Sequence, residues 1–326
     1  KGLKQLFPAQ VRVFTLDEAH ARRQQVAVDY VVRIGHGEVE PEDIELLGDT
    51  LGLNEVQLEA VHRLERRFKE EWFSRVLSPE FREQVEGLAE EMGEHPGTLR
   101  AVGRRLSALG RLPFLTPQAG AGDSVKQILG YIDSGMSVVL EFGRYNNELA
   151  YMLVANILTR RLHDLYRERM ERAMAGDEGK PQPLVIAIEE AHKFLSPRLA
   201  SQTIFGAIAR EMRKFNVTLL VIDQRPSGID DEVMSQVGTK LTCHLDNDKD
   251  IDSVLSGVAG KGELRTVLSR LNPKRQALIL GHAVPMPVVV QVREYGSPAS
   301  YRNLGFMEPA EKKAMAERDI QEWWGD

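Results

Sequence analysis

Short apolar runs alternate with helical patterns through most of the chain after residue 123, and this alternation constrains the fold more than any other feature. The candidate strands are "SVVLEF", "LVIAI", "VTLLVI", "KLTCHL", "QALIL" and "PVVVQVR". Helical patterns are found at residues 124–133, 146–174, 199–215 and 262–271. Strands that alternate with helices predict an α/β fold with a mostly parallel sheet and helices on both of its faces.

A stretch of helical character interrupts this pattern near the start of the chain. The run "VRVFTL" at residues 11–16 predicts an earlier strand, but from residue 41 to residue 110 little β signal remains. Four amphipathic helices are expected, beginning near Pro41, Asn54, Pro79 and Pro96. We therefore predict an inserted four-helix bundle. The predicted divisions are a first core segment at 1–35, the bundle at 36–122, the rest of the core at 123–296 and a C-terminal tail at 297–326.

The bulk composition narrows the class of protein. The 326 residues contain one cysteine and carry a formal net charge of −6. No internal disulfide is possible, which favours a reducing compartment and a cytoplasmic location. No apolar run approaches the roughly 20 residues that cross a bilayer, so no membrane contact is expected. The acidic balance argues against a broad basic surface for nucleic acid, but it is compatible with a narrow basic channel.

Two acidic pairs follow candidate strands, and each is followed by Ala-His. Asp17-Glu18 leads directly into "ARRQQVAV", where acids favour the start of a helix. The strand before it contains Arg12 and Thr15, which fits a more peripheral strand. Glu189-Glu190 follows the uninterrupted run "LVIAI", typical of a strand buried on both faces at the centre of a parallel sheet. Adjacent carboxylates there are costly unless they are paired or bind metal, so this pair is the candidate for magnesium binding and water activation.

Polar residues on the following helix and strand extend this candidate site. Gln224 stands at the end of "VTLLVI", where it would sense a γ-phosphate or orient the attacking water; the alternative is that it only satisfies a turn. Arg210 and Arg213 share one helix face and are candidates for clamping phosphate, including across a subunit boundary. A solvated helix face is the alternative for both arginines.

Three segments in order resemble the HerA family, the hexameric DNA-translocating ATPases related to FtsK. They are "LVIAIEEAHKFLSP", "AREMRKFNVTLLVIDQRPSGID" and "RQALILGHAVPMPVVVQVREY". The resemblance implies a RecA-like P-loop ATPase core with ATP and Mg²⁺ as cofactors. It also implies that Glu190 polarises the hydrolytic water, Glu189 holds Mg²⁺ through water, and Gln224 is the sensor. Arg210 or Arg213 would reach the nucleotide of a neighbouring subunit.

The sequence departs from that family in one respect that affects ATP binding. The phosphate loop G-x-x-x-x-G-K-[ST] does not occur, since Gly-Lys is followed by Pro181 in one place and by Gly262 in another. The family's small N-terminal β-barrel has no counterpart either. We therefore expect a C-terminal portion of a longer protein, inactive as an ATPase on its own.

The resemblance implies double-stranded DNA, a homo-hexamer and a NurA-type nuclease as partners, with a role in DNA-end processing or recombinational repair. Lys193 and Arg198, just after the second acidic pair, are candidates for DNA contacts, and simple solvent exposure is the alternative for both. The alternative function is a ring-forming scaffold ATPase that docks an effector nuclease or NADase in phage defence. A DEAH-type RNA helicase is disfavoured, because neither tandem domains nor a basic RNA path are visible in the sequence.

Overall fold

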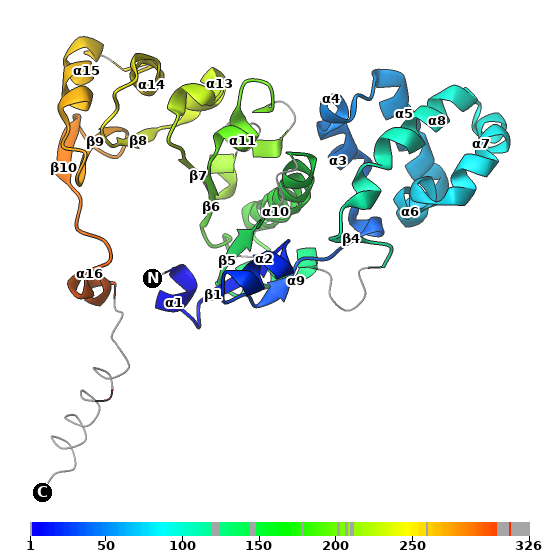
Figure 1. The fold of residues 1–326 in the computed structure, drawn as a ribbon, viewed down its shortest axis with the longest axis horizontal. Helices are drawn as coiled ribbons and strands as arrows, with labels where there is room; N and C mark the ends of the chain where they lie inside the picture. The colour runs from blue at the N-terminus through cyan, green and yellow to red at the C-terminus, as the bar shows by residue number, and fades with distance from the viewer. Residues whose placement is uncertain are drawn as a thin grey trace, which may run out of the picture.

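A computed structural model describes residues 2–118, 124–143, 148–177, 179–200, 203–205, 208, 212–258, 260–304 and 313. Figure 1 shows helices α3 to α8 at one end of the molecule, strands β8 to β10 with α14 and α15 at the other, and the long helix α10 between them. Among the described helices, none combines the length and apolar character needed to cross a bilayer.

The first sheet is parallel and has the strand order β2-β1-β5. It consists of β1 (Val11–Thr15), β2 (Tyr30–Val31) and β5 (Ser137–Glu141). The interpretation of "VRVFTL" as a peripheral strand is wrong, because β1 lies between two neighbours and Val11, Val13 and Phe14 are buried. Its two polar residues do not prevent this: Thr15 is buried and its backbone pairs with Glu141 and Val31.

The helical segment contains six α-helices between residues 41 and 106, all of which the structure describes, rather than four. They are α3 (Pro41–Leu46), α4 (Gly48–Leu51), α5 (Glu55–Phe68), α6 (Trp72–Leu77), α7 (Pro79–Met92) and α8 (Pro96–Leu106). The expected starts are present. Asn54 forms the predicted capping box, in which its side chain accepts from the Gln57 N–H at 3.0 Å. The first predicted helix breaks at Leu47, and α6 is a helix that the pattern did not predict.

This segment is built into the α/β core. The chain leaves through β3 (Ile34–Gly35) and returns through β4 (Leu115–Thr116), which pair in parallel. One apolar cluster contains residues of the helices, of β1 and of α10, among them Phe14, Leu64, Phe73, Leu106 and Met152. The helical segment and the first sheet therefore share a single core, so unfolding of either part would expose apolar residues of the other.

Helix α10 (Glu148–Ala175) connects two cores. Its buried residues include Met152 and Ile157 in the first cluster and Leu162 and Tyr166 in a second cluster around β6 and β7. A helix that is apolar on most sides must be covered on most sides, so α10 is central to the packing. The helix α9 (Ser124–Asp133) precedes it and has the predicted bounds.

The C-terminal half holds the remaining sheets. Strands β6 (Leu184–Glu189) and β7 (Val217–Ile222) pair in parallel. Strands β8 (Thr239–Thr242), β9 (Gln276–Gly281) and β10 (Val288–Gln291) form an antiparallel sheet in the order β10-β9-β8. The other α-helices described are α1 (Leu3–Leu6), α2 (Glu18–Arg23), α11 (His192–Leu195), α13 (Asp231–Gln236), α14 (Asp248–Val254), α15 (Lys261–Arg270) and α16 (Pro298–Asn303). The 3₁₀ helices described are η1 (His36–Glu38), η2 (Lys69–Glu71), η3 (Leu109–Arg111), η6 (Met212–Phe215) and η7 (Pro226–Gly228).

Two further expectations differ from what the structure describes. The helix predicted at 199–215 lies partly outside the described residues, and its end is η6. The prediction that "LVIAI" is buried on both faces is wrong, because side chains alternate along β6 and Val185 is 58% exposed. The two-stranded parallel sheet that the structure describes here has one covered face and one open face.

Candidate active site

Two parallel strands end side by side and bring the acidic pair next to the polar residues that follow β7. Their register pairs Leu184 with Val217 and continues to Glu189 with Ile222. Glu190 and Asp223 are therefore the first residues beyond each strand. In open α/β sheets this edge, beyond the carboxyl ends of parallel strands, is where ligands bind.

Glu190 and Gln224 are in direct contact at this edge. The Gln224 side-chain amide donates a hydrogen bond to Glu190 Oε1 at 3.1 Å. The Glu190 side chain is 43% exposed, so its carboxylate remains open to a ligand and to water. A carboxylate beside an uncharged amide can accept a proton from water while the amide holds a neighbouring oxygen in place.

Asp223 and His192 contact each other next to this pair, and the sequence analysis gave neither a role. The Asp223 side chain is only 3% exposed. Its Oδ2 accepts from the backbone N–H of His192 at 2.7 Å and lies 2.8 Å from His192 Nδ1, and its Oδ1 accepts from the Arg225 N–H at 2.7 Å. Burial alone would raise the pKa of Asp223, but these hydrogen bonds outweigh burial and lower the pKa below its ordinary value. Their position is the sequence signal that could have identified them, because His192 lies shortly after the end of β6 and Asp223 directly after the end of β7.

Glu189 is the candidate contact for Mg²⁺. It is the last residue of β6 and lies on its open face, whereas the preceding Ile188 is buried. Across the described residues there is no cluster of three or more metal-binding side chains. Mg²⁺ in nucleotide sites is typically held by one or two carboxylates together with phosphates and waters, and one exposed glutamate fits that donor set.

The structure describes the four basic candidates unequally. Arg210 lies outside the described residues, as does the side chain of Arg213, whose backbone belongs to η6. Lys193 is on α11, with its Nζ 5.7 Å from the centre of the Tyr151 ring. Arg198 forms an ion pair with Glu148 at the start of α10. Both described side chains are exposed, near the same end of α10.

The other acidic pair has the structural role that its sequence context predicted. Asp17 caps α2, and its side chain accepts from the His20 N–H at 2.9 Å. This cap satisfies one of the backbone donors that every helix start leaves open. The pair lies at the end of β1 in the first sheet, and the Glu189-Glu190 pair at the end of β6.

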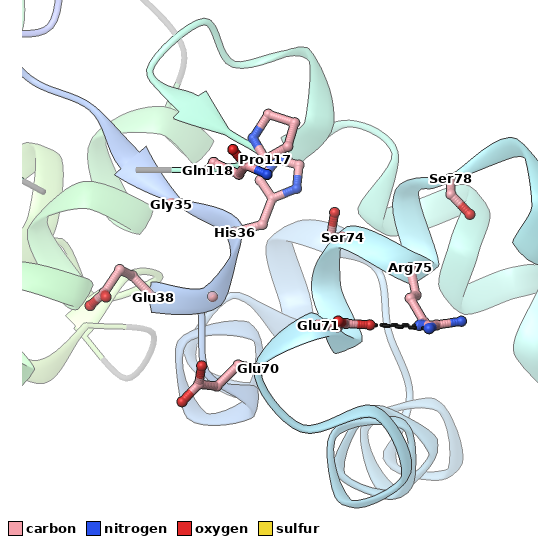
Figure 2. Close-up of a pocket in the computed structure, with 11 residues that line it drawn as sticks. Gly35, His36, Glu38, Glu70, Glu71, Ser74, Arg75, Ser78, Pro117 and Gln118 are labelled. Carbon is pink, nitrogen blue, oxygen red and sulfur yellow. Dashed lines mark hydrogen bonds and ion pairs between the residues drawn. The ribbon is translucent and has the colours of Figure 1, made fainter. Parts of the chain in front are cut away.

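A pocket of about 610 Å³ lies elsewhere, between the helical segment and the strands that flank it. Figure 2 shows His36 and Gln118 on one side of it and Ser74 and Arg75 on the other, with Arg75 paired to Glu71. The imidazole of His36 is buried, and burial lowers its pKa. This pocket belongs to the junction of the insertion with the core and not to the strand ends.

A solved structure shares the fold of this chain over most of its length. The solved structure of VirB4 of Thermoanaerobacter pseudethanolicus superposes with a TM-score of 0.51 over 91% of this chain and 84% of that chain, at 13% sequence identity. At that identity the likeness concerns the fold alone. The chain therefore shares its fold with VirB4, and the α/β fold class that the sequence predicts is confirmed.

Relatives found by sequence similarity indicate the kind of protein more narrowly than the shared fold does. The chain is 28% identical over 202 residues to the DNA double-strand break repair helicase HerA of Sulfolobus acidocaldarius. This match covers 60% of this chain and 40% of the relative. It is 30% identical over 155 residues to HerA of Pyrococcus furiosus and 32% identical over 139 residues to HerA of Saccharolobus solfataricus, in each case covering 28% of the relative. No protein-family model matches the chain.

These matches show sequence similarity to HerA proteins over part of the chain, in agreement with the resemblance of its motifs. The matched regions span 28–40% of the lengths of these three relatives.

Proposed function

We propose that this chain contributes the hydrolytic edge of an ATP-driven DNA translocase of the HerA type. The observation that carries the proposal is the 3.1 Å contact between Gln224 and Glu190 at the ends of two parallel strands. Support also comes from relatives named as DNA double-strand break repair helicases. A base and an uncharged amide at the carboxyl edge of a parallel sheet suit the transfer of a phosphoryl group to water.

Each residue has a defined task in this proposal. Glu190 accepts the proton of the attacking water, and Gln224 binds the γ-phosphate or the water and so fixes the line of attack. Glu189 would hold Mg²⁺ through water, and the bound ion would neutralise charge on the phosphates. Arg210 or Arg213 reaches the nucleotide of the adjacent subunit, where a guanidinium would stabilise the charge of the transition state.

The phosphate loop comes from outside these 326 residues in this proposal, because the sequence contains no G-x-x-x-x-G-K-[ST]. We expect the 326-residue chain alone to bind ATP weakly and to hydrolyse none. The open face of β6 and β7 is compatible with this, since an apolar sheet face normally packs against another layer.

The proposed trans arginine bears on the assembly. An arginine that acts on a neighbour's nucleotide requires a neighbouring subunit, and the assembly that we propose is a homo-hexameric ring around double-stranded DNA. Lys193 and Arg198 are proposed to contact the DNA backbone, which would make translocation independent of sequence. A NurA-type nuclease is the proposed partner in DNA-end processing or recombinational repair. The proposed location is the cytoplasm. The second candidate is a ring scaffold that docks an effector nuclease or NADase in phage defence.

Replacement of Glu190 tests the proposed chemistry. In a form of the protein that carries the phosphate loop, Glu190→Gln is expected to reduce DNA-stimulated ATP turnover by about a hundredfold or more, because general-base catalysis typically contributes that much. The matched control is Glu90→Gln on the exposed surface of α7, which should leave turnover unchanged. Full turnover in Glu190→Gln would remove the catalytic assignment. Loss of turnover without loss of partner binding would separate the motor from the scaffold.

Light scattering on the form of the protein that carries the phosphate loop tests whether the subunits assemble into a hexameric ring. A mass of six subunits at micromolar concentration is the expected result. A monomer under those conditions would argue against a trans arginine, and with it against Arg210 and Arg213 as catalytic residues.

A further inference from the structure

The backbone makes an unusual turn directly after β6. Glu190 has a φ angle of 52°, in the left-handed region that residues with a side chain seldom occupy. The chain then enters α11, with the Lys193 N–H donating to the Glu190 carbonyl at 2.9 Å and the Ala191 N–H donating to the Ile222 carbonyl at 3.3 Å. Such a conformation persists where surrounding contacts over-determine it, and it is common at functional sites.

One buried carboxylate holds this turn against the end of β7. Asp223 Oδ2 contacts His192 twice, through the backbone N–H at 2.7 Å and through ring Nδ1 at 2.8 Å. Because the Asp223 pKa is lowered, the side chain is an anion, so Nδ1 must carry the hydrogen of this bond. The backbone bond fixes where α11 starts, and the ring bond fixes how the imidazole is rotated.

The oriented imidazole points toward the proposed base. His192 Nε2 is 3.8 Å from Glu190 Oε2, so a ring that carries a hydrogen on Nε2 as well as on Nδ1 attracts this oxygen, while Gln224 donates to the other oxygen, Oε1. Glu190 is therefore flanked by His192, which is bound to Asp223, and by Gln224, which follows Asp223 in the chain. Asp223 is the common anchor of both residues that approach Glu190.

We propose that His192, locked by Asp223, is a positioning residue that sets the orientation of the Glu190 carboxylate relative to Gln224. This inference rests on the proposed function of Glu190 and adds to it a device that fixes the geometry of attack. The alternative is that His192 only satisfies a buried aspartate. The positioning role and the purely structural role predict different results for a variant that keeps the hydrogen bond to Asp223 but lacks Nε2.

The first test reads the ring directly and needs neither nucleotide nor phosphate loop. With ¹⁵N-labelled histidine in the 326-residue chain, the His192 ring should carry a hydrogen on both Nδ1 and Nε2, and its signals are identified by their loss in His192→Asn. Asp223→Asn should favour loss of one of these hydrogens, because the anion that stabilises the doubly protonated ring is removed. A ring without a hydrogen on Nε2 in the unsubstituted chain, or a ring indifferent to Asp223→Asn, would overturn the inference while leaving the role of Glu190 intact.

The second test uses turnover and a graded series of variants. In the form that carries the phosphate loop, His192→Ala should lower kcat by about tenfold to a hundredfold with little change in the KM for ATP, as expected when a reacting group is misplaced by an ångström or less. His192→Asn, whose amide can replace Nδ1 as donor to Asp223 but has no Nε2, should recover stability without full kcat. Asp223→Asn should lower kcat in the same way.

The outcomes separate the alternatives. If His192→Asn restores both stability and kcat to the unsubstituted values, the ring has only a structural role and the inference fails. If Glu190→Gln has full activity, the proposed function fails first. The matched control is His163→Asn on α10, where Nδ1 lies 3.1 Å from Asp164 away from the strand ends; it should leave kcat unchanged.

Discussion

His36 is a titratable residue whose surroundings make the molecule sensitive to pH. Its side chain is buried against Phe73, with ring centres 5.3 Å apart, and Nδ1 has no hydrogen-bond partner in the described structure. Burial lowers the pKa of His36, so the unfolded chain binds a proton more readily than the folded one. Stability should therefore be highest above the ordinary histidine pKa of about 6.5 and fall as the pH decreases through the lowered value.

Replacement of this histidine should remove that part of the pH dependence. We expect the free energy of unfolding to decrease between pH 7 and pH 5 in the unsubstituted chain, and to decrease less in His36→Phe, which keeps the ring but cannot be protonated. Urea unfolding followed by circular dichroism at several pH values measures both curves. Identical slopes for the two proteins would show that His36 does not titrate in this window.

At this scale the sequence could indicate which residues meet but not how they are connected. The contact of Glu190 with Gln224 follows from two parallel strands ending together, which apolar runs and polar ends are enough to suggest. The contacts of His192 with Asp223 depend on the left-handed turn at Glu190. No residue in that turn is a glycine, so the sequence pattern did not indicate a left-handed backbone conformation there.

At the scale of elements, a buried ion cluster joins the helical insertion to α10. The guanidinium of Arg160 donates from Nε and Nη2 to the two oxygens of Asp43, each at 3.0 Å, and Asp43 is fully buried. Burial disfavours the charge on Arg160, but its hydrogen bonds to Asp43 and Glu40 outweigh burial and raise its pKa. Arg161 also pairs with Glu40, so two successive residues of α10 anchor α3.

Removal of the arginine should be costly because it strands a buried anion. We expect Arg160→Met to lower the free energy of unfolding by about 3 to 5 kcal/mol, the usual effect of breaking a buried pair. Tryptophan fluorescence, to which Trp72 buried within the insertion contributes, reports the loss during urea unfolding. The control is Arg22→Met in an exposed pair with Glu18 on α2, where little change is expected. Equal effects for both variants would contradict a special role for the buried cluster.

The elements themselves were predicted with uneven success, for physical reasons. Helices with capping signals began where expected, as at Asn54 and Pro79, because a cap satisfies local backbone donors whatever the tertiary context. The burial of "LVIAI" was predicted wrongly, since an apolar run shows what a strand can bury and not which neighbours cover it. The basic residues Arg210 and Arg213 remain predictions.

At the scale of the whole molecule, the described strands form separate sheets and leave an apolar face uncovered. Side chains at alternate positions of β6 and β7 share that face, and the register places Ala187 beside Leu220 and Glu189 beside Ile222. Val185, Leu220 and Ile222 are 58%, 47% and 43% exposed. This face leads directly to the acidic edge, so whatever covers it also borders the candidate site.

An uncovered apolar face of this kind should make the 326-residue chain associate with itself, because contiguous exposed apolar surface drives protein contacts. Leu220→Lys places a charge at the middle of the face, where it can still extend into water. We expect it to lower the average mass seen by light scattering and to reduce the binding of a hydrophobic dye, with an unchanged melting temperature. Val56→Lys is the matched control, since Val56 is also 58% exposed but lies on α5 away from this face. If both lysine variants behave alike, the association depends on charge in general; if Leu220→Lys alone disperses the chain, the face beside Glu189 is the surface that associates.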